Sequence, residues 1–194
     1  MRNRSVLILA VVLAAAVFAT AVLAQTGSTP AVKVYIKKTE PHTVAVIKHK
    51  GPFTEVPTVM ASLMGEIDKG GYLSAGPVMA MFITPPENTP AKDLQWQVMI
   101  PVVAPGPLGQ PQFDKLGFQY LDPATVAFTF HVGSFDTVNE AYKTIFAWAK
   151  TNNYTIRGYP MEIYWSDPAK VPKDKLVTEV MVPIEEKRSS AVKN

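Results

Sequence analysis

The sequence contains no cysteine, and this is the first of several absences that limit its chemistry. Disulfide bonds, thiol catalysis and cysteine-ligated metal are therefore excluded. The three histidines do not show the spacing of a metal-binding pair, so we predict no metal site and no cofactor. A glycine-rich phosphate loop and a Gly-x-Ser-x-Gly elbow are also missing, which removes two common signatures of enzymes.

An excess of charge of either sign is absent from the chain that follows the first 24 residues. Without Arg2 and Arg4, 17 basic residues stand against 16 acidic ones, a net charge of +1. Nucleic-acid-binding surfaces are usually strongly basic, and no later hydrophobic run is long enough to span a bilayer. We therefore predict no nucleic-acid partner, and no membrane partner once the first segment is removed. A protein partner is left open.

The first 24 residues have the order of a targeting segment. Two arginines precede an apolar run from Val6 to Ala19, and the small residues Val22 and Ala24 precede Gln25. This order is typical of a secretory signal peptide, so we predict cleavage near Ala24 and a periplasmic or secreted protein with a short tether over residues 25–32. The alternative is an uncleaved anchor helix, because residues 6–24 would extend about 28 Å at about 1.5 Å per residue.

The rest of the chain repeats itself at an offset of 82 residues. Residues 43–53, TVAVIKHKGPF, align without a gap on residues 125–135, TVAFTFHVGSF, and VMIP at 98–101 aligns on VMVP at 180–183. Two copies, unlike a long array of repeats, predict one pseudo-symmetric domain over residues 33–184. We place the first repeat at residues 33–103 and the second at 122–184. Between them lies a linker rich in Pro and Gly, residues 104–121, and a polar tail follows at 185–194.

Each copy has the same predicted order of elements. Large apolar residues alternate with smaller ones over residues 125–132, which indicates a strand. Apolar residues then recur at helical spacing over residues 137–150, and two further strands follow at 160–165 and 175–183. We predict an α+β fold in which duplicated strand-helix-strand-strand units form one pseudo-twofold antiparallel sheet with two helices packed on it.

Several short motifs carry a resemblance to a known family. They are a Gly-x-Phe after the first strand of each copy, at residues 51–53 and 133–135, the segment EIYWSDP at 162–168, and residues 176–184, which end in Val-Pro-Ile. In this order they resemble the GyrI-like (DNA gyrase inhibitor-like) small-molecule-binding family, which includes effector-binding domains of bacterial transcription activators. The resemblance covers residues 32–184. It implies a hydrophobic ligand cleft between the copies and a buried Glu that meets cationic or polar ligands, at the position of Glu162. The sequence departs from the regulators by carrying a secretion signal in place of a DNA-binding helix-turn-helix.

Glu162 is also singled out by the repeat itself, because its counterpart in the first copy is Ala80. One carboxylate opposite an apolar wall suits a cationic ligand, and burial would raise its pKa toward that of a general acid or base. Tyr164 lies two residues further and shares its face. We predict that both face the cleft and that Glu162 is its only acidic group. The alternative is a solvent-facing strand carrying both side chains.

Four aromatic residues complete the predicted ligand-binding set, with ordinary core packing as the alternative for each. They are Phe82, Trp96, Phe130 and Tyr142.

Three functions fit these observations. The leading interpretation is an exported protein that binds a small hydrophobic ligand without catalysis. A cationic hydrophobic ligand is the narrower form of this interpretation. The second is a hydrolase of small electrophilic ring compounds, in which Glu162 acts as the base and Tyr164 assists it. Some members of the family resemble such hydrolases. The third is tetrapyrrole binding, since the SOUL haem-binding proteins are built on a similar duplicated unit.

Overall fold

The computed structural model of the protein describes residues 32–103 and 114–187. The predicted signal peptide, the tether up to residue 31, residues 104–113 of the predicted linker and residues 188–194 of the tail lie outside the described residues. None of the helices within the described ranges is long and apolar enough to cross a membrane.

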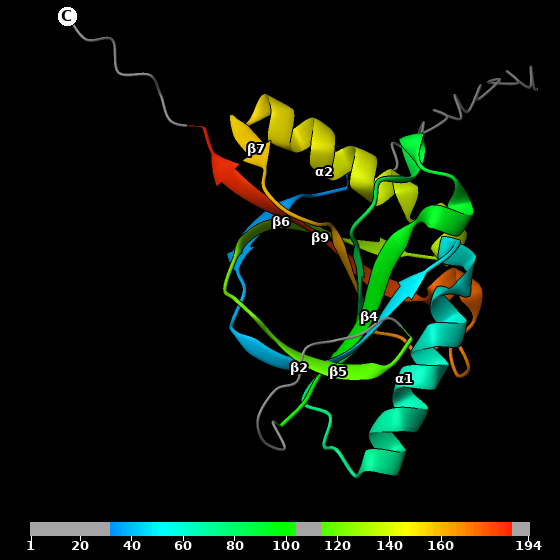
Figure 1. Ribbon diagram of the computed structural model, residues 1–194. Helices are drawn as coiled ribbons and strands as arrows, with labels where there is room; N and C mark the ends of the chain where they lie inside the picture. The colour runs from blue at the N-terminus through cyan, green and yellow to red at the C-terminus, as the bar shows by residue number, and fades with distance from the viewer. Residues whose placement is uncertain (1–31, 104–113, 188–194) are drawn as a thin grey trace, which may run out of the picture. The chain divides into compact units, whose positions relative to one another are not determined.

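The predicted α+β architecture is confirmed, because two helices pack on one large antiparallel sheet (Figure 1). In chain order the elements are β1 (Tyr35–Lys38), β2 (His42–Lys50), α1 (Val56–Gly70), β3 (Val78–Phe82), β4 (Gln95–Pro101), β5 (Leu116–Leu121), β6 (Thr125–Val132), α2 (Asn139–Thr151), β7 (Tyr154–Ile156), β8 (Met161–Tyr164) and β9 (Val177–Glu186). The strands lie side by side in the order β1-β6-β9-β8-β3-β4-β2-β5, and β7 pairs with the end of β9. This order reads the same from both ends once the two repeats are exchanged.

The pseudo-twofold axis passes between β3 and β8 at the centre of the sheet. There Ala80 is the register partner of Glu162, its own counterpart in the repeat. The other pairs of the main sheet have matching pairs at the same offset: Val44 opposite Pro101 corresponds to Val126 opposite Pro183. The pair β7–β9 is matched by a single bridge, Ser74 opposite Val102. The sequence repeat is therefore a symmetry of the fold.

Strand β5 lies within the predicted linker, residues 104–121, which is therefore shorter than predicted. Residues 116–121 pair with β2 of the first repeat, and β1, at the start of the first repeat, pairs with β6 of the second. Each repeat thus gives its first strand to the other one. The predicted tail is likewise shorter than expected, since β9 continues to Glu186 and pairs there with β7.

Helix α1 packs on the sheet through one apolar stripe. Val56, Val59, Leu63 and Ile67 are buried and recur every three or four residues, which places them on one side of the helix. The helix ends where Gly71 takes a left-handed conformation with φ of 66°, a position that favours glycine. Helix α2 covers the second half of the same sheet face through Ala141, Ile145 and Ala149.

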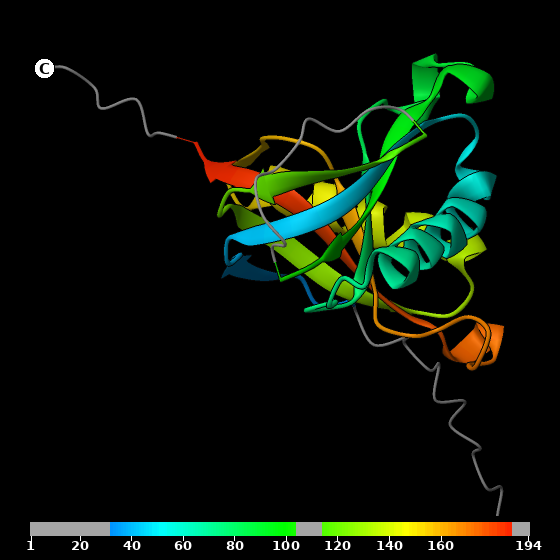
Figure 2. The same ribbon diagram turned by 60° about the horizontal axis from the view of Figure 1, so that its bottom comes forward.

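The sheet is buried on both faces. The helix-covered face carries residues such as Ala45, Trp96 and Val98 in the first repeat and Ala127 and Val180 in the second. The opposite face, which we call the interior face, lies inside the curve of the sheet (Figures 1 and 2) and gathers residues from both repeats into one cluster. A residue's odd or even position in its strand therefore decides whether it can reach the helices.

One ion pair with a buried carboxylate and a partly exposed lysine lies on the interior face. Glu179 of β9 is 1% exposed, and it accepts hydrogen bonds from Lys37 of β1 and, at 3.1 Å, from Nε1 of Trp165. In the other half of the sheet the counterparts of Glu179 and Lys37 are Gln97 of β4 and Gln119 of β5. Side chains of similar shape thus occupy equivalent positions in the two halves of the sheet. They are charged in one half and neutral in the other.

Candidate functional site

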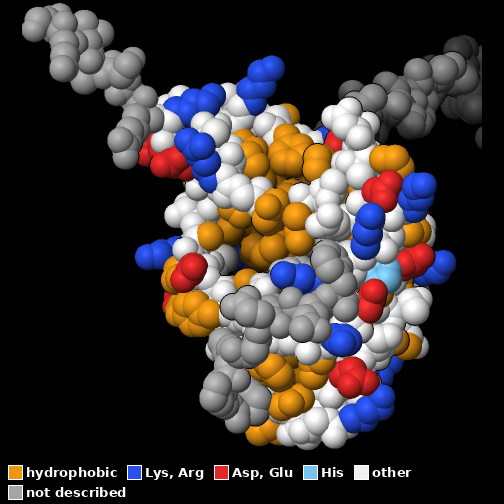
Figure 3. All heavy atoms as spheres, in the orientation of Figure 1, with side chains coloured by type: hydrophobic (Ala, Val, Ile, Leu, Met, Phe, Trp, Pro, Cys, Tyr) orange, Lys and Arg blue, Asp and Glu red, His pale blue; other side chains and the backbone are white. Residues whose placement is uncertain are grey.

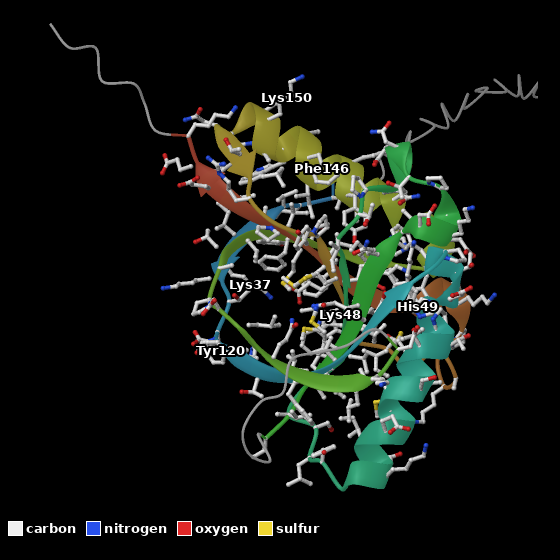
Figure 4. All side chains as sticks on the ribbon, in the orientation of Figure 1. Lys37, Lys48, His49, Tyr120, Phe146 and Lys150 are labelled. Carbon is white, nitrogen blue, oxygen red and sulfur yellow. The ribbon has the colours of Figure 1, made fainter. Side chains whose placement is uncertain are left out.

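A cleft lies over the centre of the helix-covered face and is bounded by both repeats. It has two chambers, of about 560 Å³ and about 350 Å³. The first chamber is lined by the start of α1 and by the turn before α2, and the second by α2 and the loop between β3 and β4. The chambers share four residues: Phe53, Phe82, Asn139 and Glu162. Figure 3 shows hydrophobic side chains gathered on the face where Figure 4 labels Phe146 of α2, which lines the second chamber.

The Glu162 carboxylate lies where the chambers meet and is 5% exposed. Its Oε1 accepts a hydrogen bond of 2.9 Å from the hydroxyl of Tyr142, and its Oε2 accepts one of 2.8 Å from the hydroxyl of Tyr164. In the described part of the chain no basic side chain forms an ion pair with it. A carboxylate can accept about four hydrogen bonds, so this one can still accept a donor or meet a cation.

The hydrogen-bonded group of Glu162 and two tyrosines belongs to the second repeat alone. Glu162, Tyr164 and Tyr142 correspond, at the offset of 82, to Ala80, Phe82 and Met60. All three counterparts are apolar, although the backbone around them is equivalent. The structure therefore brings together Glu162, Tyr164 and Tyr142 from the predicted set, and the role of Tyr142 as a donor was readable from the same offset.

An aromatic frame surrounds the carboxylate, and the sequence analysis missed half of it. Phe53 contacts Phe82 edge-on at 4.8 Å between ring centroids, and Phe135 contacts Tyr164 edge-on at 5.2 Å. Phe53 and Phe135 are repeat counterparts and follow the first strand of each copy. The Gly-x-Phe motif therefore supplies one cleft wall in each repeat, which its symmetric occurrence could have indicated.

Two predicted wall residues do not reach the cleft. Trp96 is completely buried beneath α1, where its Nε1 donates to the carbonyl of Gly51 at 2.8 Å, so it is a core residue. Phe130 lies on β6 in phase with Phe128, which packs on the interior face, and so it is on the opposite side of the sheet from Glu162. The alternation of residues in a strand indicates neither which face the helices cover nor how far a helix extends over it, so both positions could not be predicted from it.

Glu162 is the buried acid of the cleft, but two further carboxylates line its chambers. Exposed Asp136 lines the first chamber together with Lys173, and exposed Glu87 lines the second. The expectation of a single acidic group was therefore too narrow. Within residues 32–103 and 114–187, no group of three or more His, Asp or Glu side chains is arranged to hold a metal ion.

Burial raises the pKa of the Glu162 carboxyl above its ordinary value of 4.5, and the hydrogen bonds from Tyr164 and Tyr142 oppose that rise. Burial, together with the nearby carboxylate, also raises the pKa of both tyrosine hydroxyls well above their ordinary value, so they remain protonated donors. The site is thus a carboxyl group that loses its proton at a higher pH than an ordinary Glu. It accepts hydrogen bonds from two tyrosine hydroxyls that stay protonated.

We expect this carboxyl to make the free energy of unfolding depend on pH. A folded-state pKa above the unfolded one means that the folded protein binds more protons, so this contribution is complete below about pH 4.5 and is lost as the pH rises through the raised pKa. Urea unfolding from about pH 4 to about pH 8 should show the wild type losing stability relative to Glu162→Gln across this window. Tyr164→Phe removes a bond that lowers the pKa, so it should move the window upward. A difference between wild type and Glu162→Gln that does not change with pH would contradict this assignment.

Known proteins match this chain in one sequence segment and in fold. Residues 114–185 match the profile of the GyrI-like small molecule binding domain, so the predicted resemblance to the GyrI-like family is confirmed for that segment. No curated protein matches the sequence.

Solved structures share the fold at low sequence identity. The C-terminal domain of EcmrR superposes with a TM-score of 0.69 at 18% identity, over 80% of this chain and 98% of that one. A hydrolase from Listeria innocua superposes with a TM-score of 0.56 at 13% identity, over 81% of this chain and 94% of that one. At these identities the likeness establishes the shared fold.

One of these structures contradicts our prediction about partners. EcmrR bound to DNA superposes with a TM-score of 0.67 at 18% identity, over 80% of this chain and 58% of the EcmrR chain. A domain of this fold therefore does occur in a protein that binds DNA, and the prediction of no nucleic-acid partner was wrong. It rested on net charge, which describes a domain by itself and not the longer chain to which such a domain is joined.

Proposed function

We propose that the protein is an exported small-molecule-binding protein that holds a hydrophobic, cationic ligand in the cleft, with the Glu162 carboxylate facing the positive charge. The observation that carries the proposal is a carboxylate that is 95% buried, is held by two hydroxyls, and forms no ion pair within the described residues. A buried charge without a counter-ion is costly, and a bound cation would relieve that cost.

The surroundings of the carboxylate support the hydrophobic part of the proposal. Phe53, Phe82 and Phe135 present aromatic surface to the first chamber, and Phe146 presents it to the second. Aromatic faces attract cations through their quadrupole and bury apolar ligand surface at the same time. Both volumes are within the range of small-molecule pockets.

The experiment that tests the proposal compares two aromatic dyes of equal size, one cationic and one neutral, on the wild type and on Glu162→Gln. A loss of affinity confined to the cationic dye supports the proposal, because only the charge of the side chain has changed. An equal affinity of both proteins for both dyes would refute it.

A second candidate, a hydrolase of small electrophilic rings, is favoured by the two tyrosines. A carboxylate with a raised pKa can take a proton from water while the water oxygen attacks a ring carbon and the bond from that carbon to the ring oxygen breaks. The carboxylic acid formed in this way then gives the same proton to the opened ring oxygen, which restores the carboxylate. Tyr142 and Tyr164 would orient the base through the bonds that they already make. The Listeria innocua protein of this fold is described as a hydrolase.

Export is the remaining part of the proposal, and it rests on the order of the first 24 residues. We expect the mature protein to begin near Gln25 and to be released with the periplasmic fraction. N-terminal sequencing checks this, and recovery of an intact Met1 in the membrane fraction would replace it with the anchored alternative.

A further inference from the structure

The junction of the two chambers is lined by residues of opposite character. Of the four residues common to both chambers, Phe53 and Phe82 come from the first repeat and are apolar, whereas Asn139 and Glu162 come from the second repeat and are polar. The counterpart of Asn139 at the offset of 82 is Pro57, just as the counterpart of Glu162 is an alanine. A ligand at the junction therefore meets hydrogen-bonding side chains on one side and aromatic rings on the other.

The hydrogen-bonding groups around the carboxylate are unequal in donors and acceptors. A tyrosine hydroxyl has a single hydrogen, and both Tyr142 and Tyr164 direct theirs to Glu162. A carboxylate accepts about four hydrogen bonds, so Glu162 can still accept about two, and each tyrosine oxygen keeps acceptor capacity of its own. This hydrogen-bonded group therefore has spare acceptors and no spare donor.

The Asn139 side chain adds a further acceptor at the junction. Asn139 is the exposed first residue of α2. Among the described residues, the side-chain hydrogen bonds around the start of this helix are made by Ser134, Thr137 and Glu140. The Asn139 amide is therefore free to meet a ligand, and its carbonyl oxygen accepts hydrogen bonds.

We propose, on the basis of the proposed function, that the positive charge of the ligand is a nitrogen with several N–H bonds, a primary ammonium or an amidinium, and not a quaternary ammonium. Each N–H bond can fill a spare acceptor of Glu162 or Asn139, and hydrogen bonds between charged groups are stronger than neutral ones. A quaternary ammonium has no N–H bond, so the remaining lone pairs of a carboxylate that is 5% exposed would lack donors. Aromatic rings attract both kinds of cation, so the acceptors decide between them.

The other charged side chains of the cleft do not discriminate between the two kinds of cation. Asp136 and Lys173 line the first chamber only, Glu87 lines the second chamber only, and all three are exposed. Water screens exposed charges, so these groups act alike on any ligand with one positive charge. The selectivity therefore depends on the junction, where the N–H groups face the second repeat and the apolar part of the ligand faces Phe53 and Phe82.

The experiment compares two naphthalene dyes that differ only in the cationic group, one with an aminomethyl group and one with a trimethylammoniomethyl group. Both carry one positive charge at pH 7, and fluorescence titration measures their affinities. We expect the wild type to bind the primary ammonium dye at least about tenfold more tightly. Asn139→Leu, which keeps the size of the side chain, should weaken that dye by about three- to tenfold and leave the trimethylated dye unaffected. Thr54→Val, which removes a hydroxyl that lines the first chamber only, should change neither affinity.

Two results would overturn the proposal: equal or tighter binding of the trimethylated dye by the wild type, or an equal effect of Asn139→Leu on both dyes. The first comparison requires no variant, so it does not depend on the folding of one. If the wild type binds both dyes equally and Glu162→Gln weakens both, the cationic ligand of the proposed function stands and only the selectivity for N–H groups is refuted. If neither dye binds to the wild type, the proposed function itself fails.

Discussion

Replacement of Glu162 by Gln is expected to lower the affinity for a cationic aromatic dye by about 1.5–3 kcal/mol, roughly 10- to 100-fold, and to leave a neutral dye of the same size almost unaffected. The substitution keeps the shape of the side chain, and its amide oxygen still accepts from one of the two hydroxyls, Tyr142 or Tyr164. Its NH₂ group can donate to the oxygen of the other hydroxyl. Fluorescence titration of the two dyes measures the difference directly.

The matched control is Glu87→Gln, which removes the same charge from an exposed position in the second chamber. Exposed charges are screened by water, so this variant should bind the cationic dye nearly as well as the wild type. Equal losses in the two variants would mean that the dye senses only the overall charge of the cleft. If the wild type also opens electrophilic rings, Glu162→Gln should keep its binding and lower turnover by about 10²- to 10⁴-fold, the usual contribution of a general base.

Replacement of Lys37 by Gln is expected to lower the free energy of unfolding by about 1–3 kcal/mol, which is less than the cost of breaking a fully buried pair because Lys37 is partly exposed. The change leaves the buried Glu179 carboxylate without its cation, while the Trp165 hydrogen bond remains. The double variant Lys37→Gln/Glu179→Gln copies the amides Gln119 and Gln97 at the equivalent positions and should recover most of the loss. Urea unfolding of the wild type, both single variants and the double variant gives the coupling energy.

Lys143→Gln provides the comparison for this cycle, since its pair with Glu140 lies on the exposed side of α2. Its effect on stability should be close to zero. Should Lys37→Gln cost no more than Lys143→Gln, or should the double variant be less stable than the two single changes predict together, the ion pair would not be what holds β1 to the sheet.

The repeat offset was the most informative feature of the sequence. It predicted the order of elements in each copy, and it singled out Glu162 because Ala80 stands at the equivalent position. Applied to Tyr142 and Phe135, the same offset would also have predicted the second hydroxyl donor and the second aromatic wall. The offset pairs equivalent positions of the two repeats. Where the two residues of a pair differ in polarity, the difference indicates a position that serves function more than packing.

The misplaced residues show what the pattern could not contain. The alternation in β6 separates Phe130 from Thr129, but both faces of this sheet are buried, so alternation does not indicate which face the helices cover. Strand β5 is short and follows a segment rich in Pro and Gly, and its partner β2 lies about 70 residues earlier in the chain. Pairing at that distance depends on the folded arrangement of both repeats and leaves no local signal.

The exchange of first strands between the repeats bears on the origin of a cleft with one carboxylate on its pseudo-twofold axis. A chain containing one repeat could complete its sheet by pairing its first strand with the sheet of an identical chain. The product would be a symmetric homodimer with the same cleft. Any carboxylate on its axis would then face a second copy of itself, and like charges directly opposite each other are destabilising. Only after two units are joined in one polypeptide can their sequences diverge, so that Ala80 stands opposite Glu162. Duplication followed by divergence is thus what allows a single charge on a twofold axis.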